Sequence, residues 1–251
     1  MTRGFSEFEF DLPGALLVHL VEKFAGMEDA PLDANIVSAI PDAQGVYQLF
    51  LDGKLSYIGK TDAEAGLRKR LSRHASKILH RVGLDPARIS FRAIRVFVFT
   101  AVDLETQLIK HYGVKTWNGS GFGSNDPGRQ RDTTDYKPEH FDALYPIDID
   151  RDLPGLMLPN EGTAAEFFAL LRYEIPYTFR AQNIGGKSRV PHKDLFSPVK
   201  LPARTPPTTR GVLGAIVPQL PAGWQAVRLP SHVILYKDDK NYPSGEVLVR
   251  S

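Results

Sequence analysis

The sequence predicts an α+β fold, with a small, mostly antiparallel three-stranded sheet flanked by helices. Three observations carry this prediction. Two β-rich runs, 45–51 and 54–60, are joined by Asp52-Gly53; a two-faced helical pattern follows over 64–82; and a third apolar run, 90–99, precedes another helical pattern. A small α+β extension is expected at the C-terminal end, where short strand patterns follow a helical one.

The first elements follow from spacing and turn chemistry. Apolar residues at helical intervals predict an amphipathic helix over 15–26, directly after Pro13-Gly14. The runs 45–51 and 54–60 are expected to pair as a hairpin. Asp52-Gly53 favours a type I′ turn, because both central residues of that turn need positive φ.

The pattern over 64–82 predicts a helix with one apolar and one basic face. The apolar positions recur every three or four residues: Leu67, Leu71, Ala75, Ile78 and Val82. The other side gathers Arg70, Arg73, His74, Lys77 and Arg81. One face is expected to pack and the other to meet an anion. The third strand is expected over 90–99, and Thr100-x-x-Asp103 is typical of a cap opening a helix through Tyr112.

The C-terminal half is divided by prolines. Residues 117–138 read as loop and 161–173 as a short helix, and nine of the 19 prolines fall between Pro176 and Pro230. The predicted organisation is a domain over 1–179 with an N-terminal helix and helical insertions, a Pro-rich basic linker over 180–207, and a small α+β module over 208–251. That module is expected to hold a helix over 208–219 and strands near 224–228, 232–237 and 246–250.

Composition excludes several classes of protein. The 251 residues contain no cysteine, which rules out a disulfide framework and thiolate nucleophiles or metal ligands. The N-terminus carries acids where a secretory signal needs an apolar run, and no stretch is long and apolar enough to span a membrane. We therefore expect a cytoplasmic protein that does not insert into membranes. Basic residues cluster in 59–95, ten against three acids, which fits a polyanion-binding surface or a solvated helix face.

One ordered set of residues points to chemistry. Gly45-Val46-Tyr47 precedes Tyr57-Ile58-Gly59 by ten residues, and Arg70 and His74 follow on the basic helix. Glu105 lies on the next predicted helix, and Asn118 begins a segment that runs through Asp132. This order over 40–135 resembles the GIY-YIG nuclease superfamily. The segment Trp117 to Asp132 is similar to that of Eco29kI-like type II restriction endonucleases.

The resemblance implies a GIY-YIG fold and an enzyme that hydrolyses phosphodiesters. It also implies that the enzyme depends on Mg²⁺, for which Mn²⁺ can substitute. Tyr47 would position or activate water, and neighbouring cations would have to favour its phenolate if it acts as a base. Tyr57 would position phosphate or water, Arg70 would stabilise the phosphate and His74 would relay a proton. Glu105 would hold the metal, and Asn118 would support phosphate or Glu105. Without the other motif residues, Tyr47 and Tyr57 would be interpreted as half-buried aromatic residues of a sheet, and Glu105 as an exposed residue of a helix.

Further cations complete the expected DNA interface. They are Lys60, Arg68, Arg73, Lys77, Arg129 and Arg131. The last two are also suited to closing a loop through Asp126 or Asp132. The resemblance implies a homodimer that cuts both strands of duplex DNA at a short, GC-rich palindrome. It also implies a cognate DNA methyltransferase in the host.

Two other functions stay open. A repair or nicking endonuclease shares the two tyrosine motifs, although the Trp117 to Asp132 segment is not expected in it. A non-catalytic DNA-binding protein with a degenerate nuclease fold is the other, and the presence together of Tyr47, Arg70, His74 and Glu105 speaks against it.

Overall fold

A computed structural model describes residues 4, 6–7, 11–62, 64–97, 103–123, 128–185 and 188–251. The chain is mixed α+β and forms two compact units. The first unit comprises Met1–Ala75 and Asp85–Gly119, and the second comprises Ser76–Leu84 and Ser120–Ser251. Within the described residues, no helix has the length and apolar character needed to cross a lipid bilayer.

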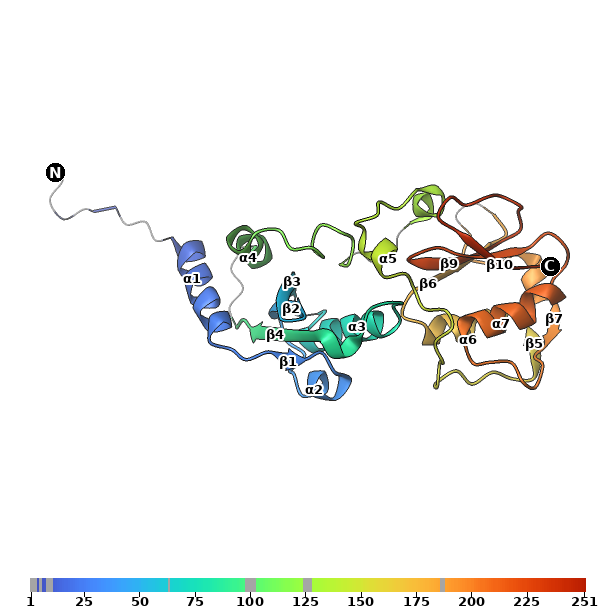
Figure 1. Ribbon diagram of the computed structural model, residues 1–251, viewed down its shortest axis with the longest axis horizontal. Coiled ribbons are helices and arrows are strands. Elements are labelled where there is room, and N and C mark those ends of the chain that lie inside the picture. The colour runs from blue at the N-terminus through green and yellow to red at the C-terminus, as the bar shows by residue number, and fades with distance from the viewer. Residues whose placement is uncertain are drawn as a thin grey trace. The chain divides into compact units, whose positions relative to one another are not determined.

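The sheet of the first unit contains the three predicted strands, β2 (Gly45–Leu51), β3 (Lys54–Thr61) and β4 (Ile89–Arg95). A two-residue edge strand, β1 (Ala30–Pro31), extends it to the antiparallel order β1-β4-β2-β3 (Figure 1). The predicted hairpin turn is confirmed, because Asp52 and Gly53 have φ values of 51° and 71°. Of the expected third strand over 90–99, residues 98 and 99 lie outside the described part of the chain.

Two helices cover one face of this sheet. The predicted N-terminal helix is α1 (Leu12–Ala25), and the helix ending at Tyr112 is α4 (Leu104–Tyr112). Apolar side chains of both pack against Val46 of β2 and Ile58 of β3. Thr100, one half of the expected capping signal, lies outside the described residues, and Asp103 itself caps α4 by accepting from the Thr106 N–H. A short helix, α2 (Ala34–Ser38), precedes β2.

The basic helix, α3 (Leu67–Leu79), is amphipathic as predicted and somewhat shorter than the pattern over 64–82. Its Leu67 and Leu71 are buried. A Cβ atom at Gly45 of β2 would lie 2.7 Å from Cδ1 of Leu67, so the helix approaches the strand backbone closely. Successive residues of a strand point to opposite faces, so α3 meets the face that bears Tyr47 rather than the face that bears Val46.

The second unit is built on another four-stranded sheet, of order β10-β8-β9-β6. Its strands are β6 (Thr178–Ala181), β8 (Gln225–Arg228), β9 (His232–Tyr236) and β10 (Glu246–Arg250), and β6 is parallel to β9. Two helices, α6 (Ala164–Glu174) and α7 (Thr209–Ile216), pack on one side of this sheet (Figure 1). The remaining elements of this unit are α5 (Phe141–Leu144), the two-stranded sheet of β5 (Glu161–Thr163) and β7 (Pro198–Lys200), and the 3-10 turns η2 (Arg129–Thr133), η3 (Lys193–Phe196) and η4 (Val217–Gln219). The 3-10 turn η1 (Pro86–Arg88) belongs to the first unit.

The domain boundaries expected from the sequence differ from this division. The segment 180–207, predicted as a linker, contains the end of β6, the η3 turn and β7. Leu195 and Val199 of this segment are buried in the same apolar core as Phe167 and Trp224. Proline-rich composition suggested a linker, but apolar side chains between the prolines pack, so the segment is part of the second unit. The C-terminal α+β unit is accordingly larger than the predicted module over 208–251.

Candidate active site

Tyr47 occupies the middle of the first sheet and has small neighbours on both sides. In the register of the strands it pairs with Gly59 of β3 and Ala93 of β4. A Cβ atom at Gly59 would lie only 2.4 Å from the Tyr47 hydroxyl oxygen. The glycine of the second motif therefore makes room for the phenol of the first, which is fully buried.

Two polar side chains meet at the Tyr47 hydroxyl. Its oxygen lies 2.8 Å from Nε2 of His74 and accepts from Nε of Arg70 at 3.2 Å. Arg70 and His74 are four residues apart on α3, so they project from one face of the helix. The structure thus brings together three of the residues that the sequence singled out, from two elements far apart in the chain.

The direction of proton donation follows from this geometry. Arginine can only donate, so the Tyr47 oxygen accepts from Arg70. We assign the Tyr47 proton to the bond with Nε2 of His74, which makes that ring nitrogen the acceptor. Burial raises the pKa of Tyr47 above its ordinary value and outweighs the opposing charge of Arg70. The lowered pKa that a general base would need is therefore not found, and the resting phenol is protonated.

Tyr57 completes an aromatic cluster around His74. Its ring centroid lies 6.0 Å from that of Tyr47 and 5.6 Å from that of the His74 imidazole. Tyr57 is buried, as is His74, which is 3% exposed. The three rings restrict one another's orientation, so the imidazole is fixed both by packing and by its hydrogen bond with Tyr47.

Asn118 supports the site through the backbone of β3. Its Oδ1 accepts from the Ile58 N–H at 3.0 Å, and its Nδ2 donates to the Ile58 carbonyl at 2.8 Å. The amide therefore pairs with the free edge of β3 as another strand would. The Trp117 N–H also donates to the Ser56 carbonyl, at 3.0 Å. Asn118 thus anchors the segment after α4 beside the second tyrosine motif.

Glu105 approaches from the first turn of α4. It is half-buried, and burial raises the pKa of its carboxyl. The positive charges of Lys60 and Arg70 oppose that rise, whereas Asp103 adds to it. Lys60 itself forms an ion pair with Asp103, with 2.9 Å between Nζ and Oδ1. Glu105 is accordingly within electrostatic range of the guanidinium that binds Tyr47.

A divalent metal at Glu105 would have few protein ligands. Among the described residues, no three His, Asp or Glu side chains gather closely enough to enclose a metal ion. A single carboxylate is still compatible with Mg²⁺, which often keeps several waters and takes one or two carboxylates with phosphate oxygens of the substrate. Glu105 fits that mode of binding, because it keeps some exposed surface and lies near the cation that would meet the phosphate.

The other predicted DNA-binding cations are distributed over both units. Arg68 of α3 is exposed and lies 3.6 Å from the carboxylate of Asp42. Arg73 is also exposed, and burial together with the neighbouring charge of Arg70 lowers its pKa. Lys77 belongs to the second unit, where it donates to the Phe122 carbonyl and lies over the Phe122 ring. Contact with DNA stays a prediction for all of them.

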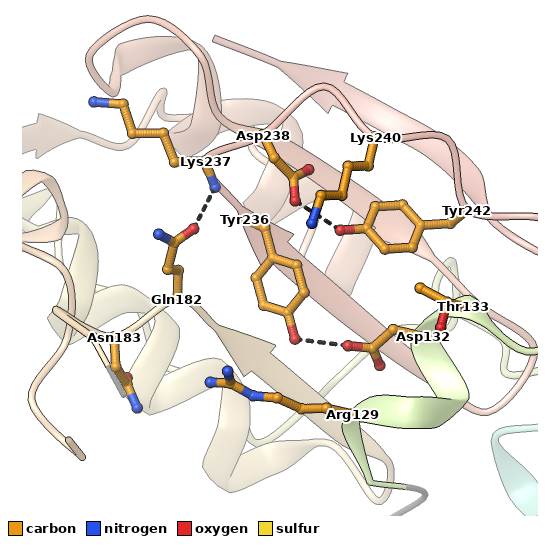
Figure 2. A pocket seen from close by; sticks show the side chains of 11 residues that line it. Arg129, Asp132, Thr133, Gln182, Asn183, Tyr236, Lys237, Asp238, Lys240 and Tyr242 are labelled. Atoms are coloured by element: carbon orange, nitrogen blue, oxygen red, sulfur yellow. Dashed lines mark hydrogen bonds between the residues drawn. The ribbon is translucent and has the colours of Figure 1, made fainter. Parts of the chain in front are cut away.

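Arg129 and Arg131 lie in the η2 turn of the second unit. Arg131 stacks on the ring of Tyr136, with 5.2 Å from its guanidinium carbon to the centroid. Arg129 lines a cleft of about 460 Å³ between this turn and the ends of β6 and β9 (Figure 2). Arg81, predicted to lie on the basic face of the helix, is instead buried in an ion pair with Asp142 at 2.8 Å.

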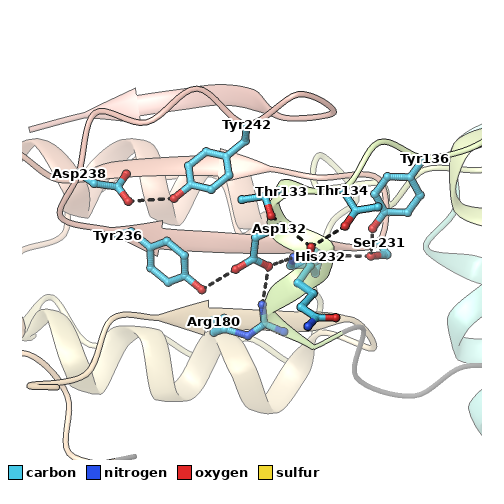
Figure 3. Close-up of polar contacts among 11 residues, drawn as sticks. Asp132, Thr133, Thr134, Tyr136, Arg180, Ser231, His232, Tyr236, Asp238 and Tyr242 are labelled. Carbon is cyan, nitrogen blue, oxygen red and sulfur yellow. Dashed lines mark hydrogen bonds and ion pairs between the residues drawn. The ribbon is translucent and has the colours of Figure 1, made fainter. Parts of the chain in front are cut away.

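A buried polar network beside the cleft was not foreseen from the sequence. The Asp132 carboxylate accepts from Arg180 at 2.6 Å and from the Tyr236 hydroxyl at 2.9 Å, and it lies 2.7 Å from Nε2 of His232 (Figure 3). The sequence instead suggests Asp132 as a loop-closing partner of Arg129 or Arg131. The residues of the network come from three segments far apart along the chain, η2, β6 and β9, so no local motif indicates their contact.

Comparisons with known proteins give no family for this chain. No protein-family model matches the sequence, and no curated protein matches it.

Proposed function

We propose that this protein is a metal-dependent endonuclease of GIY-YIG type that hydrolyses phosphodiesters of duplex DNA. The observation that carries the proposal is the Tyr47 hydroxyl, held between Nε2 of His74 at 2.8 Å and Nε of Arg70 at 3.2 Å. The role of Gly59 supports it as well. Gly59 and both motif tyrosines serve one local arrangement, which is an unusual coincidence if the motif arose by chance.

Hydrolysis of a phosphodiester needs a water in line with the leaving oxygen and compensation for negative charge on the phosphate. A half-buried guanidinium supplies that compensation effectively, because the surrounding dielectric is low. Arg70 would bind the scissile phosphate. Its hydrogen bond to Tyr47 fixes the position of the guanidinium before substrate arrives.

Tyr47 and His74 would handle the proton. With Nε2 of His74 as acceptor, the phenol can pass its proton to the imidazole when it takes one from the attacking water. This relay requires no phenolate in the resting enzyme, so it agrees with the raised pKa of Tyr47. Tyr57 would hold the imidazole in the orientation that accepts the proton.

Glu105 would hold Mg²⁺, or Mn²⁺ in its place. When bound, such an ion stabilises charge on the phosphate and on the leaving oxygen. The resemblance noted above extends the proposal to a type II restriction endonuclease. It would act as a homodimer on a short, GC-rich palindrome, in a host that carries the matching methyltransferase.

The test is cleavage of supercoiled plasmid and unmethylated phage DNA by purified protein, with Mg²⁺ and with EDTA. Wild type should give discrete linear fragments with Mg²⁺ only, and Glu105→Ala and Arg70→Ala should give none. Glu64→Ala is a matched control, because Glu64 is exposed. Nicked circles without linear product would favour the repair or nicking activity. DNA that stays intact although it is bound would favour the non-catalytic alternative.

A further inference from the structure

The cleft of the second unit lies where two parallel strands end. β6 and β9 run in parallel register from Thr178 opposite His232 to Ala181 opposite Leu235. The N–H of Gln182, directly after β6, donates to the Leu235 carbonyl at 3.0 Å. The segments after both strands therefore leave the sheet at the same edge. In open, mostly parallel α/β sheets, ligands bind in the crevice outside the carboxyl ends of the strands. Here β6 and β9 are the parallel pair, whereas β8 is antiparallel to β9, and the cleft lies at the ends of the parallel pair.

Two tyrosines form fixed walls of this cleft. The Tyr236 hydroxyl donates to Asp132 and the Tyr242 hydroxyl donates to Asp238, each at 2.9 Å. Their ring centroids lie 6.4 Å apart. Because both hydroxyls are anchored, the rings cannot turn freely. Tyr236 is partly exposed and presents a rigid aromatic surface to the cleft, whereas Tyr242 is 5% exposed and packs in an apolar cluster with Val227 and Ile234. The volume of about 460 Å³ is within the usual range for a small organic ligand.

Two side-chain amides lie across Tyr236 from Tyr242 (Figure 2). Oε1 of Gln182 accepts from the Lys237 N–H at 2.8 Å, and Nδ2 of Asn183 donates to the Ser188 carbonyl at 2.6 Å. The backbone thus orients both amides. Within the described part of the chain, a donor on Gln182 and an acceptor on Asn183 have no partner. A donor and an acceptor of this kind are the groups that read the edge of a nucleobase.

Charge at the cleft favours an anion. Lys237 is paired with Asp194, with 2.7 Å between Nζ and the carboxylate oxygen. Asp132 and Asp238 accept hydrogen bonds from buried or half-buried groups of the protein itself. Arg129 and Lys240 also line the cleft, and neither forms an ion pair with another residue that the structure describes. These two cations are available for a phosphate.

We propose that this cleft binds a single nucleotide. The base would lie against Tyr236, the amides of Gln182 and Asn183 would read its edge, and Arg129 and Lys240 would hold its phosphate. The inference rests on the proposed function in one respect, since DNA is then the expected source, as a nucleotide turned out of the duplex. A free nucleoside monophosphate has the same chemistry and is the other source.

The first arm of the test is calorimetric titration of the full chain with each deoxynucleoside monophosphate, with deoxyribose 5-phosphate and with inorganic phosphate. At least one nucleotide should bind roughly tenfold or more tightly than the two base-free compounds. Arg129→Ala and Lys240→Ala should each weaken that binding by about tenfold, as expected for a lost charge-assisted hydrogen bond. Arg204→Ala and Lys193→Ala are matched controls, because both residues are exposed in the same unit and outside the cleft.

The second arm uses duplexes with 2-aminopurine at successive positions. Fluorescence should rise at one position when protein binds, and the rise should be lost in the Arg129→Ala and Lys240→Ala variants but not in the controls. A response in this arm identifies DNA as the source, whereas a response in the titration alone identifies a free nucleotide. If neither arm responds, or if every response survives both cleft variants, the proposal is wrong.

Both arms are also run with Glu105→Gln, so that failure of the nuclease proposal can be recognised separately. Nucleotide binding by a protein that cuts no DNA would contradict the proposed function and leave this inference standing. If DNA cleavage is lost in Glu105→Gln but neither arm responds, the proposed function is supported and the nucleotide-binding inference is wrong.

Discussion

The phenol of Tyr47 lies directly against the backbone of Gly59, its partner on the neighbouring strand. A Cβ atom at position 59 would be 2.4 Å from the phenolic oxygen and 2.5 Å from the ring carbon that bears it. Tyr47 is fully buried, and the atoms that would clash are held by His74 and Arg70. The tyrosine of one motif and the glycine of the other are therefore parts of one packing arrangement.

Gly59→Ala should displace the Tyr47 ring and lower the rate of DNA cleavage at least 100-fold, because loss of a positioned proton-transfer group costs about that much. Overpacking a sheet interior also costs roughly 1–3 kcal/mol of unfolding free energy. Single-turnover cleavage and urea denaturation measure the two effects. Gly26→Ala is the control, since a Cβ there makes only ordinary contacts of 3.7 Å and more. Unchanged cleavage by Gly59→Ala would show that the position of the phenol is unimportant.

Tyr47→Phe keeps the ring and removes only the hydroxyl that joins His74 to Arg70. We expect the protein to fold, to bind DNA within a few-fold of wild type, and to cleave it roughly 100-fold to 10,000-fold more slowly. Filter binding and single-turnover kinetics separate the two quantities. Tyr112→Phe, a change in a half-buried helical tyrosine, should leave both unchanged. Cleavage at the wild-type rate by Tyr47→Phe would contradict the proton relay.

Glu105→Gln should abolish cleavage and yet make the protein more stable at neutral pH. Burial and the charge of Asp103 raise the pKa of Glu105, so the ionised carboxylate destabilises the fold. With the folded pKa above the unfolded value, this penalty is complete above the folded pKa and disappears as the pH falls through it to the unfolded value.

Thermal denaturation from pH 7 down to about pH 4 checks this sign, since unfolded glutamate titrates near 4.3. The gain in thermal stability of Glu105→Gln over wild type should shrink as the solution is acidified. Glu64→Gln, at an exposed position, should follow wild type throughout. A difference between Glu105→Gln and wild type that grows on acidification would contradict the raised pKa.

Asn118→Asp should loosen the segment that follows α4. The carboxylate can still accept from the Ile58 N–H, but it can no longer donate to the Ile58 carbonyl and repels it instead. A loss of about 1–3 kcal/mol in the free energy of unfolding is expected, as for a buried acceptor without a donor. Urea denaturation measures it. Asn35→Asp, at an exposed helical position, should cost much less.

Asp132→Asn should destabilise the second unit by about 3 kcal/mol or more, the usual cost of breaking a buried ion pair. Asp132 is 4% exposed and contacts Arg180, His232 and Tyr236. Burial opposes ionisation of Asp132, but hydrogen bonds from His232 and Tyr236 and the charge of Arg180 lower its pKa overall. Asp239→Asn, at an exposed position, is the control for denaturation at neutral pH.

The pH dependence of this variant has a definite sign. A folded pKa below the unfolded value means that Asp132 stabilises the fold fully above the unfolded pKa, near 3.9, and loses this effect as the pH falls further. The difference between wild type and Asp132→Asn should therefore be constant at neutral pH and should narrow only in acid. If the difference in unfolding free energy begins to narrow near pH 6, a group other than Asp132 is responsible for it.

Local patterns in the sequence determined most of the first unit. Helical spacing predicted α1 and α3, and Asp52-Gly53 predicted the hairpin turn, because these features depend on neighbouring residues alone. The four-residue interval between Arg70 and His74 predicted that they share a helical face. The same reasoning was wrong about 180–207, where apolar residues between prolines pack into a core that composition does not reveal.

Only the tertiary structure decided which distant side chains meet. The spacing of the motifs does not show that Gly59 must be small because Tyr47 lies over it, or that Asp132 pairs with Arg180 and His232. The spacing also does not show whether the pKa of Tyr47 is raised or lowered; burial raises it and outweighs the effect of a nearby cation. Burial and contact depend on the whole packed chain, whereas sequence patterns report only the preferences of short segments.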